Sequence, residues 1–382
     1  MRFATVCSGI EAASAAWEPH GWEPVFFSEI EPFPCAVLAH HYPNVPNYGD
    51  MTQFEEWPDA DVDVLAGGTP CQSFSVAGLR AGLADPRGNL MLTYLAIARR
   101  YRPRWVVWEN VPGVLSSNGG RDFGAFLRGL GECGYGFAYR VLDAQFCRTR
   151  RFPRAVPQRR RRVFVVGYLG DWRPAAAVLF DAESLRGNPA PRREAGERPS
   201  AAVIKGAAIG RKPENGPQRG DVIADGSCFT LTTNETHATI TSHDPACTLT
   251  ARERKGALPE ADLSTVVAFG GCNTTDHQGD KAFGPGDAWP CLAAQGGNNG
   301  GGAGGLLVQP WAAVRRLTPV ECERLQGFPD GFTRIPYRGK PADKCPDGPR
   351  YKALGNSWAV NCADWLAERI GHVEAILQSE AA

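Results

Sequence analysis

The chain has 382 residues, of which 43% are apolar, and its 41 basic side chains are balanced by 41 acidic ones, so net charge gives no global sign of nucleic-acid binding. This length predicts one large domain and one smaller one. Twelve cysteines lack zinc-like spacing, no apolar stretch reaches membrane-spanning length, and no signal peptide precedes the first strand-like segment. We therefore expect a cytoplasmic protein with reduced thiols, no metal and no membrane contact.

Short apolar runs alternate with longer helical patterns through the first 170 residues. The apolar runs are predicted strands, at 3–7, 25–28, 62–65, 105–108 and 163–166. The patterns between them predict helices at 11–18, 34–41, 89–100 and 122–133. Such alternation is typical of an α/β fold, with a mostly parallel sheet that helices cover on both faces.

Three features near predicted strand ends suggest a nucleoside cofactor. The first loop, 7–11, contains Gly9, which lets the backbone approach a ligand closely, although a tight turn explains this glycine equally well. Glu29 follows the second strand, where a carboxylate either binds ribose hydroxyls or is simply exposed, and Asp50 follows the next segment. Because ligands of such sheets bind at the carboxyl ends of the strands, these residues predict a cofactor site at that edge.

The most informative stretch is 68–75, which reads Gly-Thr-Pro-Cys-Gln-Ser-Phe-Ser. It follows the strand at 62–65, so Cys71 is presented on a loop that Pro70 stiffens. Hydrogen-bonding residues, rather than core residues, flank this cysteine. That setting favours a nucleophile over the commoner interpretation of a cysteine as a small buried thiol.

The fourth strand ends in a second candidate group. Glu109 lies beside the apolar residues Trp108 and Val111, so burial is expected to raise its pKa and let it deliver a proton. The structural alternative is a carboxylate that caps the following helix.

The segment 148–162 contains eight arginines and no acid, a local cationic patch that the neutral total conceals. A solvated face or a tail is the alternative. The patch opens the strand at 163–166, and alternate strand residues share a face. Gln158, Arg160 and Arg162 are therefore predicted to point together, away from Arg159 and Arg161.

The composition changes after Trp172. From about 174 to 310 the chain is rich in Gly, Pro, Thr and Asn and has little helical periodicity. The segments 228–232 and 247–250 alternate apolar and hydroxylated residues as half-exposed strands do. We expect a smaller, irregular β-rich domain here.

Helical pattern returns at 318–325, with Thr318 as a plausible N-cap and Pro319 in the first turn. A Gly-Asn turn at 355–356 is predicted to precede a final helix over 357–370, with Ser357 as its N-cap.

In order and content, these motifs resemble those of DNA (cytosine-5)-methyltransferases of the bacterial and phage restriction–modification type. The resemblance covers roughly 1–170 and 313–370, and the insert between them is unmatched. The matching motifs are the loop 7–11, the octapeptide 68–75, Glu109-Asn110-Val111, the Gln-x-Arg-x-Arg pattern at 158–162, the segment 316–329 and Gly355-Asn356-Ser357.

The resemblance implies a Rossmann-like fold that depends on S-adenosyl-L-methionine, with a catalytic and cofactor-binding domain (1–173), a target-recognition domain (174–310) and a C-terminal segment (311–382) that completes the catalytic domain. It implies catalytic roles for Cys71, Glu109, Arg160 and Arg162. It implies cofactor contacts by Gly9, Ile10, Glu29, Ile30, Asp50, Met51, Pro70, Leu90, Asn356 and Ser357. It implies DNA contacts by Gln72, Ser73, Ser75, Gln158 and Arg159.

In the mechanism so implied, the Cys71 thiolate adds to carbon 6 of a cytosine that has left the base stack. Glu109 protonates or hydrogen-bonds N3, and Arg162, assisted by Arg160, stabilises O2. Double-stranded DNA is the expected partner, held through its phosphates by the arginine patch. A monomer is expected, with a cognate restriction endonuclease as a functional partner.

Two departures from the family pattern stand out. Cys7 and Glu11 occupy positions where many members carry Phe and Gly, which removes an aromatic contact to the cofactor. Between Gln145 and Val156 the chain is longer than the usual link and adds arginines, for which we expect a role over DNA phosphates.

Of three rival functions, two remain open and one is excluded by the sequence. An RNA cytosine methyltransferase of the same fold and a non-catalytic DNA-binding relative stay as alternatives, although a binding module needs neither Cys71, Glu109 nor Arg162. A nicotinamide-dependent oxidoreductase is excluded, because no Gly-x-Gly-x-x-Gly loop follows the first strand.

Overall fold

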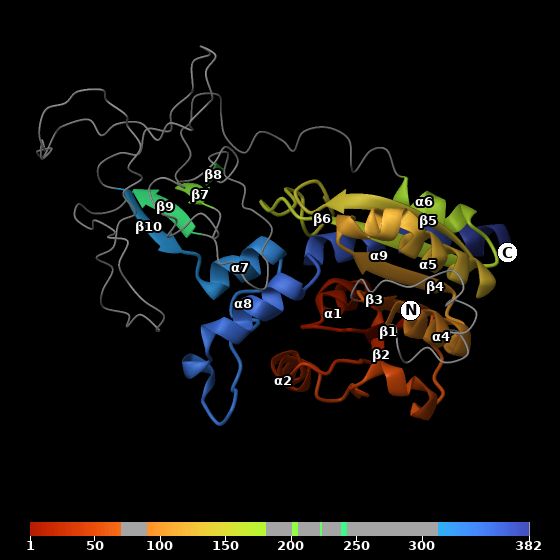
Figure 1. Ribbon diagram of the computed structural model, residues 1–382, viewed down its shortest axis with the longest axis horizontal. Coiled ribbons are helices and arrows are strands. Elements are labelled where there is room, and N and C mark those ends of the chain that lie inside the picture. The colour runs from red at the N-terminus through yellow and green to blue at the C-terminus, as the bar shows by residue number, and fades with distance from the viewer. Residues whose placement is uncertain (70–89, 181–200, 205–221, 224–237, 243–311, 382) are drawn as a thin grey trace, which may run out of the picture. The chain divides into compact units, whose positions relative to one another are not determined.

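The computed structural model describes residues 1–69, 90–180, 201–204, 222–223, 238–242 and 312–381 (Figure 1). The chain divides into two compact units, one formed by 1–191 with 319–382 and the other by 192–318. The loop that carries Cys71 and the Thr-rich segments 228–232 and 247–250 lie outside the described residues.

The first unit is built on a six-stranded sheet with the strand order β2-β1-β3-β4-β6-β5. The strands are β1 (Arg2–Val6), β2 (Glu23–Phe26), β3 (Val64–Gly67), β4 (Trp105–Asn110), β5 (Tyr135–Asp143) and β6 (Arg161–Leu169). β2, β1, β3 and β4 are parallel, whereas β6 runs antiparallel to both β4 and β5. This mostly parallel sheet confirms the predicted α/β class, and the edge strand β5 adds to the strands predicted from the sequence.

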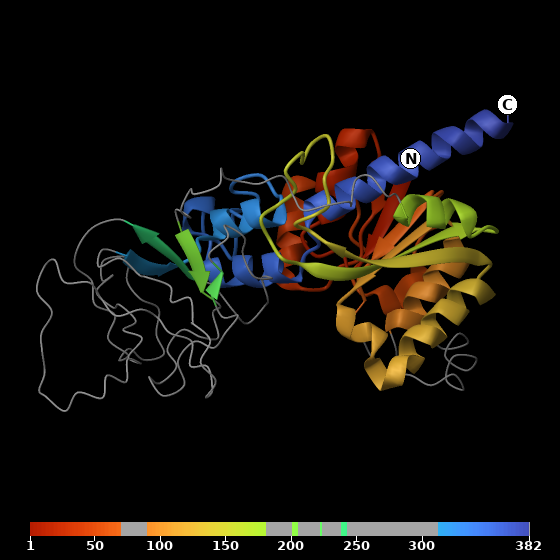
Figure 2. The same ribbon diagram turned by 90° about the horizontal axis from the view of Figure 1, so that it is seen from above.

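Helices cover both faces of this sheet. In Figure 2 the long blue helix α9 lies along one face, and the orange and yellow helices α4 and α5 lie along the other. The α-helices are α1 (Ala12–Trp17), α2 (Pro32–His41), α4 (Leu90–Tyr101), α5 (Arg121–Glu132), α6 (Arg173–Leu179), α7 (Pro319–Gln326), α8 (Asp347–Asn356) and α9 (Val360–Ala381). Short 3-10 helices are η1 (Glu18–His20), η2 (Met51–Glu56), η4 (Pro112–Leu115), η5 (Ser117–Gly120) and η8 (Ala342–Lys344). Within the described ranges, none of the helices has the length and apolar character to span a bilayer.

Alternating strand residues divide the core between the two faces. Val6, Leu65 and Val106 belong to one buried cluster, which also contains apolar residues of α4 and α5. Trp105 points to the opposite face, where its Nε1 donates to Glu374 of α9 at 2.7 Å. Both faces are thus buried, which explains why β1, β3 and β4 are nearly continuous apolar runs in the sequence. Burial of each large apolar side chain contributes about 1.5–3 kcal/mol to this arrangement.

Helix α6 (Arg173–Leu179) also belongs to the first unit, although the sequence predicted that this domain ends at 173. It packs on β5 and β6 of the sheet and on α9. Arg140 of β5 donates to the carbonyl of Leu179 at 2.8 Å, which fixes the end of the helix against the edge strand.

The C-terminal segment is organised by a buried carboxylate. Glu323 of α7 accepts hydrogen bonds from the backbone amides of Gly331 and Thr333, at 2.6 and 2.8 Å, and from Arg350 of α8 at 3.2 Å. These contacts hold α7, the following loop and α8 together as one structure.

Helix α8 changes the predicted end of the chain. Gly355 and Asn356 lie in its last turn rather than in a free turn, and Ser357 is its C-cap instead of the N-cap of the final helix. The final helix begins at Val360 and runs to Ala381, well past the predicted end at Ile370. α8 was missed because its sequence shows no clear helical period.

The second unit contains a four-stranded antiparallel sheet with the order β10-β9-β7-β8. Its strands are β7 (Ala201–Ile204), β8 (Val222–Ile223), β9 (Ala238–Ser242) and β10 (Ala312–Arg316). The strands described in this unit agree with the β-rich character predicted for a smaller domain.

Candidate active site

The antiparallel direction of β6 creates the central feature of the site. Because β6 runs against β4, the start of β6 meets the carboxyl end of β4, and Glu109 pairs in register with Phe164. Arg162 lies two residues before Phe164 and therefore shares its face of the sheet. Its Nε lies 2.9 Å from Oε1 of Glu109. The carboxylate and the guanidinium that the sequence predicted as catalytic are thus joined directly.

Glu109 is only 8% exposed. Burial raises the pKa of its carboxyl above the ordinary value, and the positive charges of Arg162 and Arg160 partly offset this rise. The indole of Trp358 also donates a hydrogen bond to the carboxyl. A buried carboxyl with a raised pKa and fixed neighbours is suited to give up or share a proton with a ligand.

Trp358 is a residue of the site that sequence reasoning missed. It follows Gly355-Asn356-Ser357 directly, and its ring meets that of Phe164 edge-on, with the centroids 5.6 Å apart. The signal that could have found it was its place next to a recognised motif, in a segment expected to return to the catalytic domain.

Arg160 makes backbone contacts that the sequence did not predict. It is 2% exposed, and its guanidinium donates to the backbone carbonyls of Gly355 and Ser357, at 3.1 and 2.5 Å. The sequence predicted that Arg160 assists Arg162 at a base oxygen, and the structure adds a second contact, since its Nη2 holds the backbone that carries Asn356 and Trp358.

Replacing Arg160 by methionine is expected to destabilise the fold, because two buried carbonyl groups would lose their donor. The expected loss is about 1–3 kcal/mol for each group left without a partner. Urea unfolding followed by circular dichroism measures this loss. The matched control is Arg161→Met at the exposed neighbouring position, expected within about 0.5 kcal/mol of wild type. Equal stability of the two variants would contradict this role for Arg160.

Gln158 is fully buried, with 0% of its surface exposed. The structure thus buries a side chain that the sequence predicted to contact DNA. Within the described part of the chain, neither atom of its amide has a hydrogen-bond partner. Arg159, the next residue, is exposed, as the strand alternation predicts.

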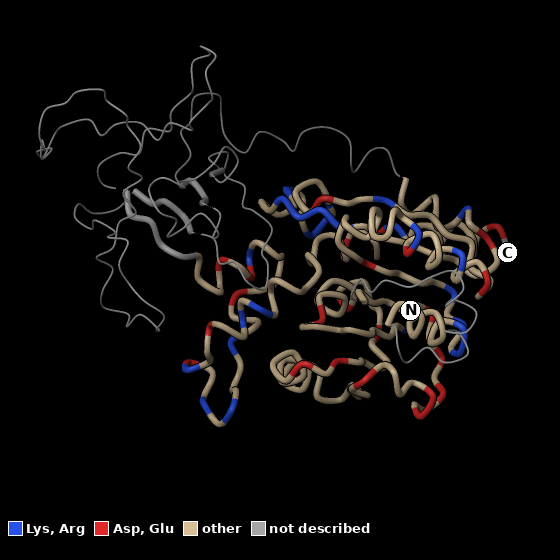
Figure 3. The backbone as a smooth tube through the Cα atoms, in the orientation of Figure 1, with Lys and Arg blue, Asp and Glu red and all other residues tan. Residues whose placement is uncertain are grey.

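The cationic run 148–162 appears in Figure 3 as blue segments between β5 and β6. Part of this charge serves internal contacts. Arg151 donates to the carbonyls of Ala15 and Ala16 at the end of α1 and pairs with the buried Asp364 of α9 at 2.8 Å. Five of the eight arginines are exposed at the surface: Arg150, Arg151, Arg154, Arg159 and Arg161.

The loop with the predicted nucleophile starts from a fixed point. Thr69 is buried, its hydroxyl accepts a hydrogen bond from Trp108 Nε1 at 3.0 Å, and its carbonyl accepts one from Asn110 Nδ2 at 2.8 Å. Both donors flank Glu109 on β4. The predicted site residues that follow lie outside the described residues: Pro70, Cys71, Gln72, Ser73 and Ser75. Leu90, where the description resumes, is the first residue of α4.

Two residues of the first loop hold an unusual backbone conformation without being glycines. Cys7 and Glu11 both have positive φ, 50° and 60°, a region that glycine adopts most easily. Glu11 offsets this strain as the N-cap of α1, because its carboxylate accepts from the amide and hydroxyl of Ser14, at 3.1 and 2.6 Å, and from Thr5. Burial raises the pKa of Glu11 to about 7.

Cys7 is a thiol rather than a thiolate at neutral pH. Burial, together with the negative charges of Glu29 and Asp50, raises the pKa of Cys7 to about 12. Its Sγ lies 3.6 Å from Sδ of Met51. Cys7 therefore lies near the site but is unsuited to act as a nucleophile.

The predicted ribose acid joins two loops. Glu29 accepts from the backbone amide of Gly9 at 2.8 Å and from the amides of Ile30 and Glu31 at 2.7 and 2.8 Å. Ile30 is 66% exposed, an unusual position for a large apolar side chain. Asp50 caps η2 by accepting from the amide of Thr52 at 2.9 Å, and it remains exposed.

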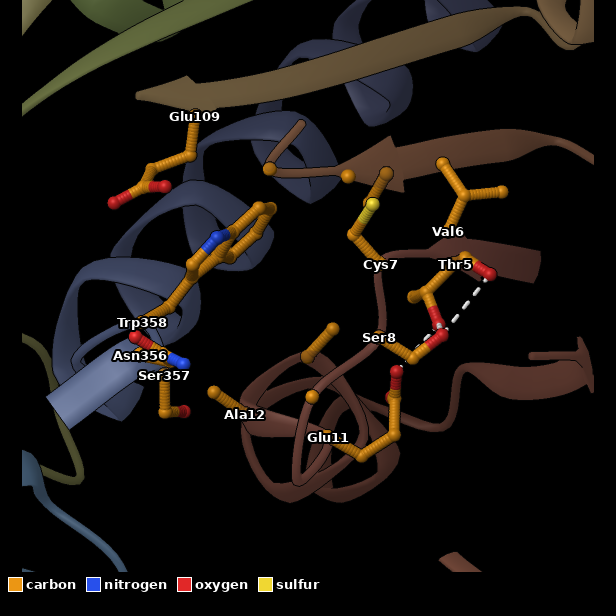
Figure 4. Close-up of a pocket in the computed structure, with 15 residues that line it drawn as sticks. Thr5, Val6, Cys7, Ser8, Glu11, Ala12, Glu109, Asn356, Ser357 and Trp358 are labelled. Carbon is orange, nitrogen blue, oxygen red and sulfur yellow. Dashed lines mark hydrogen bonds between the residues drawn. The ribbon is translucent and has the colours of Figure 1, made fainter. Parts of the chain in front are cut away.

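Several predicted residues line one cavity of about 50 Å³ (Figure 4). It lies between the first loop, Gly68 at the end of β3, Glu109 and the 356–358 segment. Of the predicted residues, this cavity brings together Gly9, Glu109, Asn356 and Ser357. Ile10 and Met51 are instead buried in the core, so they support the loop rather than line the cavity. Among the described residues no group of three or more His, Cys, Asp or Glu side chains is placed to hold a metal ion.

The sequence is similar to those of known methyltransferases. Residues 1–372 match the family model described as C-5 cytosine-specific DNA methylase. A protein of Escherichia phage P1 named DNA N-6-adenine-methyltransferase is 36% identical, over 96% of this chain and 61% of that protein. The type II methyltransferase M.HhaI of Haemophilus parahaemolyticus is 25% identical, over 97% of this chain and 94% of its own. This chain thus spans about three fifths of the phage P1 relative and nearly all of M.HhaI.

Solved structures resemble this fold along its whole length. Dnmt2 methyltransferase of S. pombe superimposes with a TM-score of 0.52 at 14% identity, over 99% of both chains. The methyltransferase EhMeth of Entamoeba histolytica gives a TM-score of 0.53 at 15% identity, over 97% of this chain and 98% of that one. At such identities the likeness concerns the fold alone.

Proposed function

The chain belongs to the C-5 cytosine-specific DNA methylase family, and from this premise we propose that it transfers a methyl group from S-adenosyl-L-methionine to carbon 5 of cytosine in double-stranded DNA. One observation carries the proposal. The buried Glu109 is paired with Arg162 at 2.9 Å, and its neighbours on β4, Trp108 and Asn110, anchor Thr69 at the start of the 68–75 loop. A carboxyl, a cation and a cysteine-bearing loop at one strand end are what addition to a pyrimidine ring requires.

The residues around the first loop fit S-adenosyl-L-methionine. Glu29 offers carboxylate oxygens next to Ile30, an exposed apolar surface suited to an adenine ring, and the exposed Asp50 offers a second acceptor. The cavity of about 50 Å³ has room for a few water molecules or a small group, so the nucleoside would lie outside it over these residues. When bound, this cofactor supplies an electrophilic methyl group.

The residues of the chain act on the cytosine. The Cys71 thiolate donates an electron pair to carbon 6, which breaks the 5,6 double bond and makes carbon 5 nucleophilic. Glu109 gives a proton or a hydrogen bond to N3, and Arg162 stabilises the charge that develops on O2. Once carbon 5 is methylated, a base removes its proton, the double bond re-forms and the thiolate leaves. Cys71 follows the anchored Thr69 by only two positions in the sequence.

Other parts of the chain are proposed to bind the DNA. The target cytosine has to leave the stack, because a duplex hides both faces of the ring. The exposed arginines of the 148–162 segment neutralise phosphates, and the unit 192–318 reads the flanking bases. A restriction endonuclease with the same recognition sequence is the functional partner, and the enzyme acts as a monomer.

The name of the phage P1 relative raises a second candidate, methylation of the adenine N6 amine. An exocyclic amine attacks a methyl donor directly and needs no thiolate adduct, and adenine has no O2 for Arg162 to stabilise. The buried Glu109–Arg162 pair therefore favours cytosine.

Analysis of the product separates these activities. The purified chain is incubated with S-adenosyl-L-methionine carrying a labelled methyl group and, in parallel, with mixed-sequence duplex DNA or transfer RNA. Digestion to nucleosides and mass spectrometry are expected to give labelled 5-methylcytosine from DNA alone. Labelled N6-methyladenine would overturn the assignment of the base, and 5-methylcytosine from RNA alone would overturn the assignment of the substrate. Bisulfite sequencing of the DNA then gives the recognised sequence.

A further inference from the structure

Trp358 is held in place by contacts that do not involve Glu109. Its ring packs edge-on against Phe164, which pairs in register with Glu109. The backbone just before it is fixed by Arg160, which donates to the carbonyls of Gly355 and Ser357. The indole is thus held by contacts of its own, and Figure 4 shows its nitrogen directed toward the neighbouring carboxyl of Glu109.

Gly68 provides the space for this meeting. A Cβ atom at position 68 would lie 3.0 Å from Oε2 of Glu109 and 3.1 Å from Nε1 of Trp358. The carboxyl and the indole therefore close over the backbone of the strand end that leads into the 68–75 loop. Any side chain at position 68 would push one or both away, because 3.0–3.1 Å is tighter than ordinary Cβ contacts.

We propose that Trp358 is a positioning residue for Glu109, with its indole N–H and the guanidinium of Arg162 together fixing the carboxyl in the orientation that meets N3 of the flipped base. This inference deepens the proposed function and rests on it. Trp358 need not touch the base, and it acts through the carboxyl that does.

The charges around Glu109 give the expected direction of its pH behaviour. Arg162 and Arg160 are the cations that face the carboxyl, and Cys7 and Glu11 line the same cavity. A hydrogen bond to a carboxylate stabilises its charged form, so loss of the indole N–H should raise the pKa of Glu109. Because Glu109 acts as the acid, activity falls as the pH rises through this pKa, and the alkaline limb of the rate profile should move to higher pH.

The test compares three variants in single-turnover methylation of duplex DNA across a range of pH. Trp358→Phe keeps a ring against Phe164 and removes only the donor, whereas Trp358→Leu removes both. For both variants the maximal rate is expected to fall about tenfold, and the alkaline limb of the pH profile to move about one pH unit higher. Both changes are on the scale of one charge-assisted hydrogen bond. The control is Trp172→Phe at an exposed tryptophan away from the cavity, expected to match wild type. If the alkaline limb of Trp358→Phe stayed at the pH found for the wild type, the inference would be overturned.

A double-mutant cycle with Glu109→Gln tests whether Trp358 acts through the carboxyl. If it does, Trp358→Phe should slow the Glu109→Gln enzyme less than twofold, because the partner of its donor is already gone. A full tenfold effect in that background would overturn the inference. Should Trp358→Phe fail to fold, Gly68→Ala takes its place and must shift the limb in the same direction. Absence of 5-methylcytosine from the wild-type reaction would instead count against the proposed function.

Discussion

Replacing Cys71 by alanine is expected to abolish methyl transfer while binding of duplex DNA and S-adenosyl-L-methionine survives. Carbon 5 of cytosine is a poor nucleophile until a group adds to carbon 6, and alanine has no electron pair to donate. The expected loss in rate is at least about ten-thousandfold, the order found when a covalent nucleophile is removed from an enzyme. Labelled methyl incorporation measures the rate, and filter binding and calorimetry measure the two affinities.

A mechanism-based trap gives this prediction a second readout. With 5-fluorocytosine at the target position, the fluorine blocks the final loss of a proton, so the wild-type enzyme should remain covalently attached to the DNA. Cys71→Ala should give no adduct, and Cys133→Ala, at a buried thiol of the α4–α5 core, should give the wild-type amount. Full turnover by Cys71→Ala, or an adduct that forms without Cys71, would remove this residue from the mechanism.

The sequence predicted those strands whose burial on both faces leaves a direct pattern of apolar residues. β1, β3 and β4 are buried on both faces, so they read as apolar runs, and Glu109 was found because it ends such a run. The edge strand β5 escaped because its burial is partial and irregular, and its residues show no clear alternation. Helix α8 escaped because Gly355 and Asn356, which commonly mark turns, lie within its last turn.

The contacts of the site were harder to predict, because they join residues far apart in the chain. Strand alternation placed Gln158, Arg160 and Arg162 on one face, which does not distinguish a side chain that meets a ligand from one that is buried. The structure gives the two arginines different contacts: Arg162 reaches Glu109, whereas Arg160 donates to the backbone at 355 and 357. Trp358 could not be inferred from spacing at all, since its partner is 249 positions earlier in the sequence (358 − 109).

Replacing Glu109 by glutamine is expected to slow methyl transfer at least about a hundredfold, the usual scale of general-acid catalysis. Glutamine has nearly the same shape, so packing against the cavity wall is kept, but it cannot release a proton to N3. Its amide also turns donors toward Arg162 and Trp358, which both donate to the carboxyl in the wild type. The measurement is the single-turnover rate with duplex DNA, alongside the yield of the 5-fluorocytosine adduct, which should form equally slowly because addition itself needs the proton.

The pH profile distinguishes the loss of an acid from a general disturbance of the site. The carboxyl donates only while it is protonated, so the wild-type rate should fall as the pH rises through the pKa of Glu109, which burial raises above its ordinary value. Glutamine does not titrate, so this limb should disappear in Glu109→Gln. The control Glu132→Gln, at the exposed end of α5, should keep both the rate and the limb. A normal rate in Glu109→Gln would assign the proton to another donor. A slow rate that kept the wild-type limb would mean that the titrating group lies elsewhere and that Glu109 acts only by its shape.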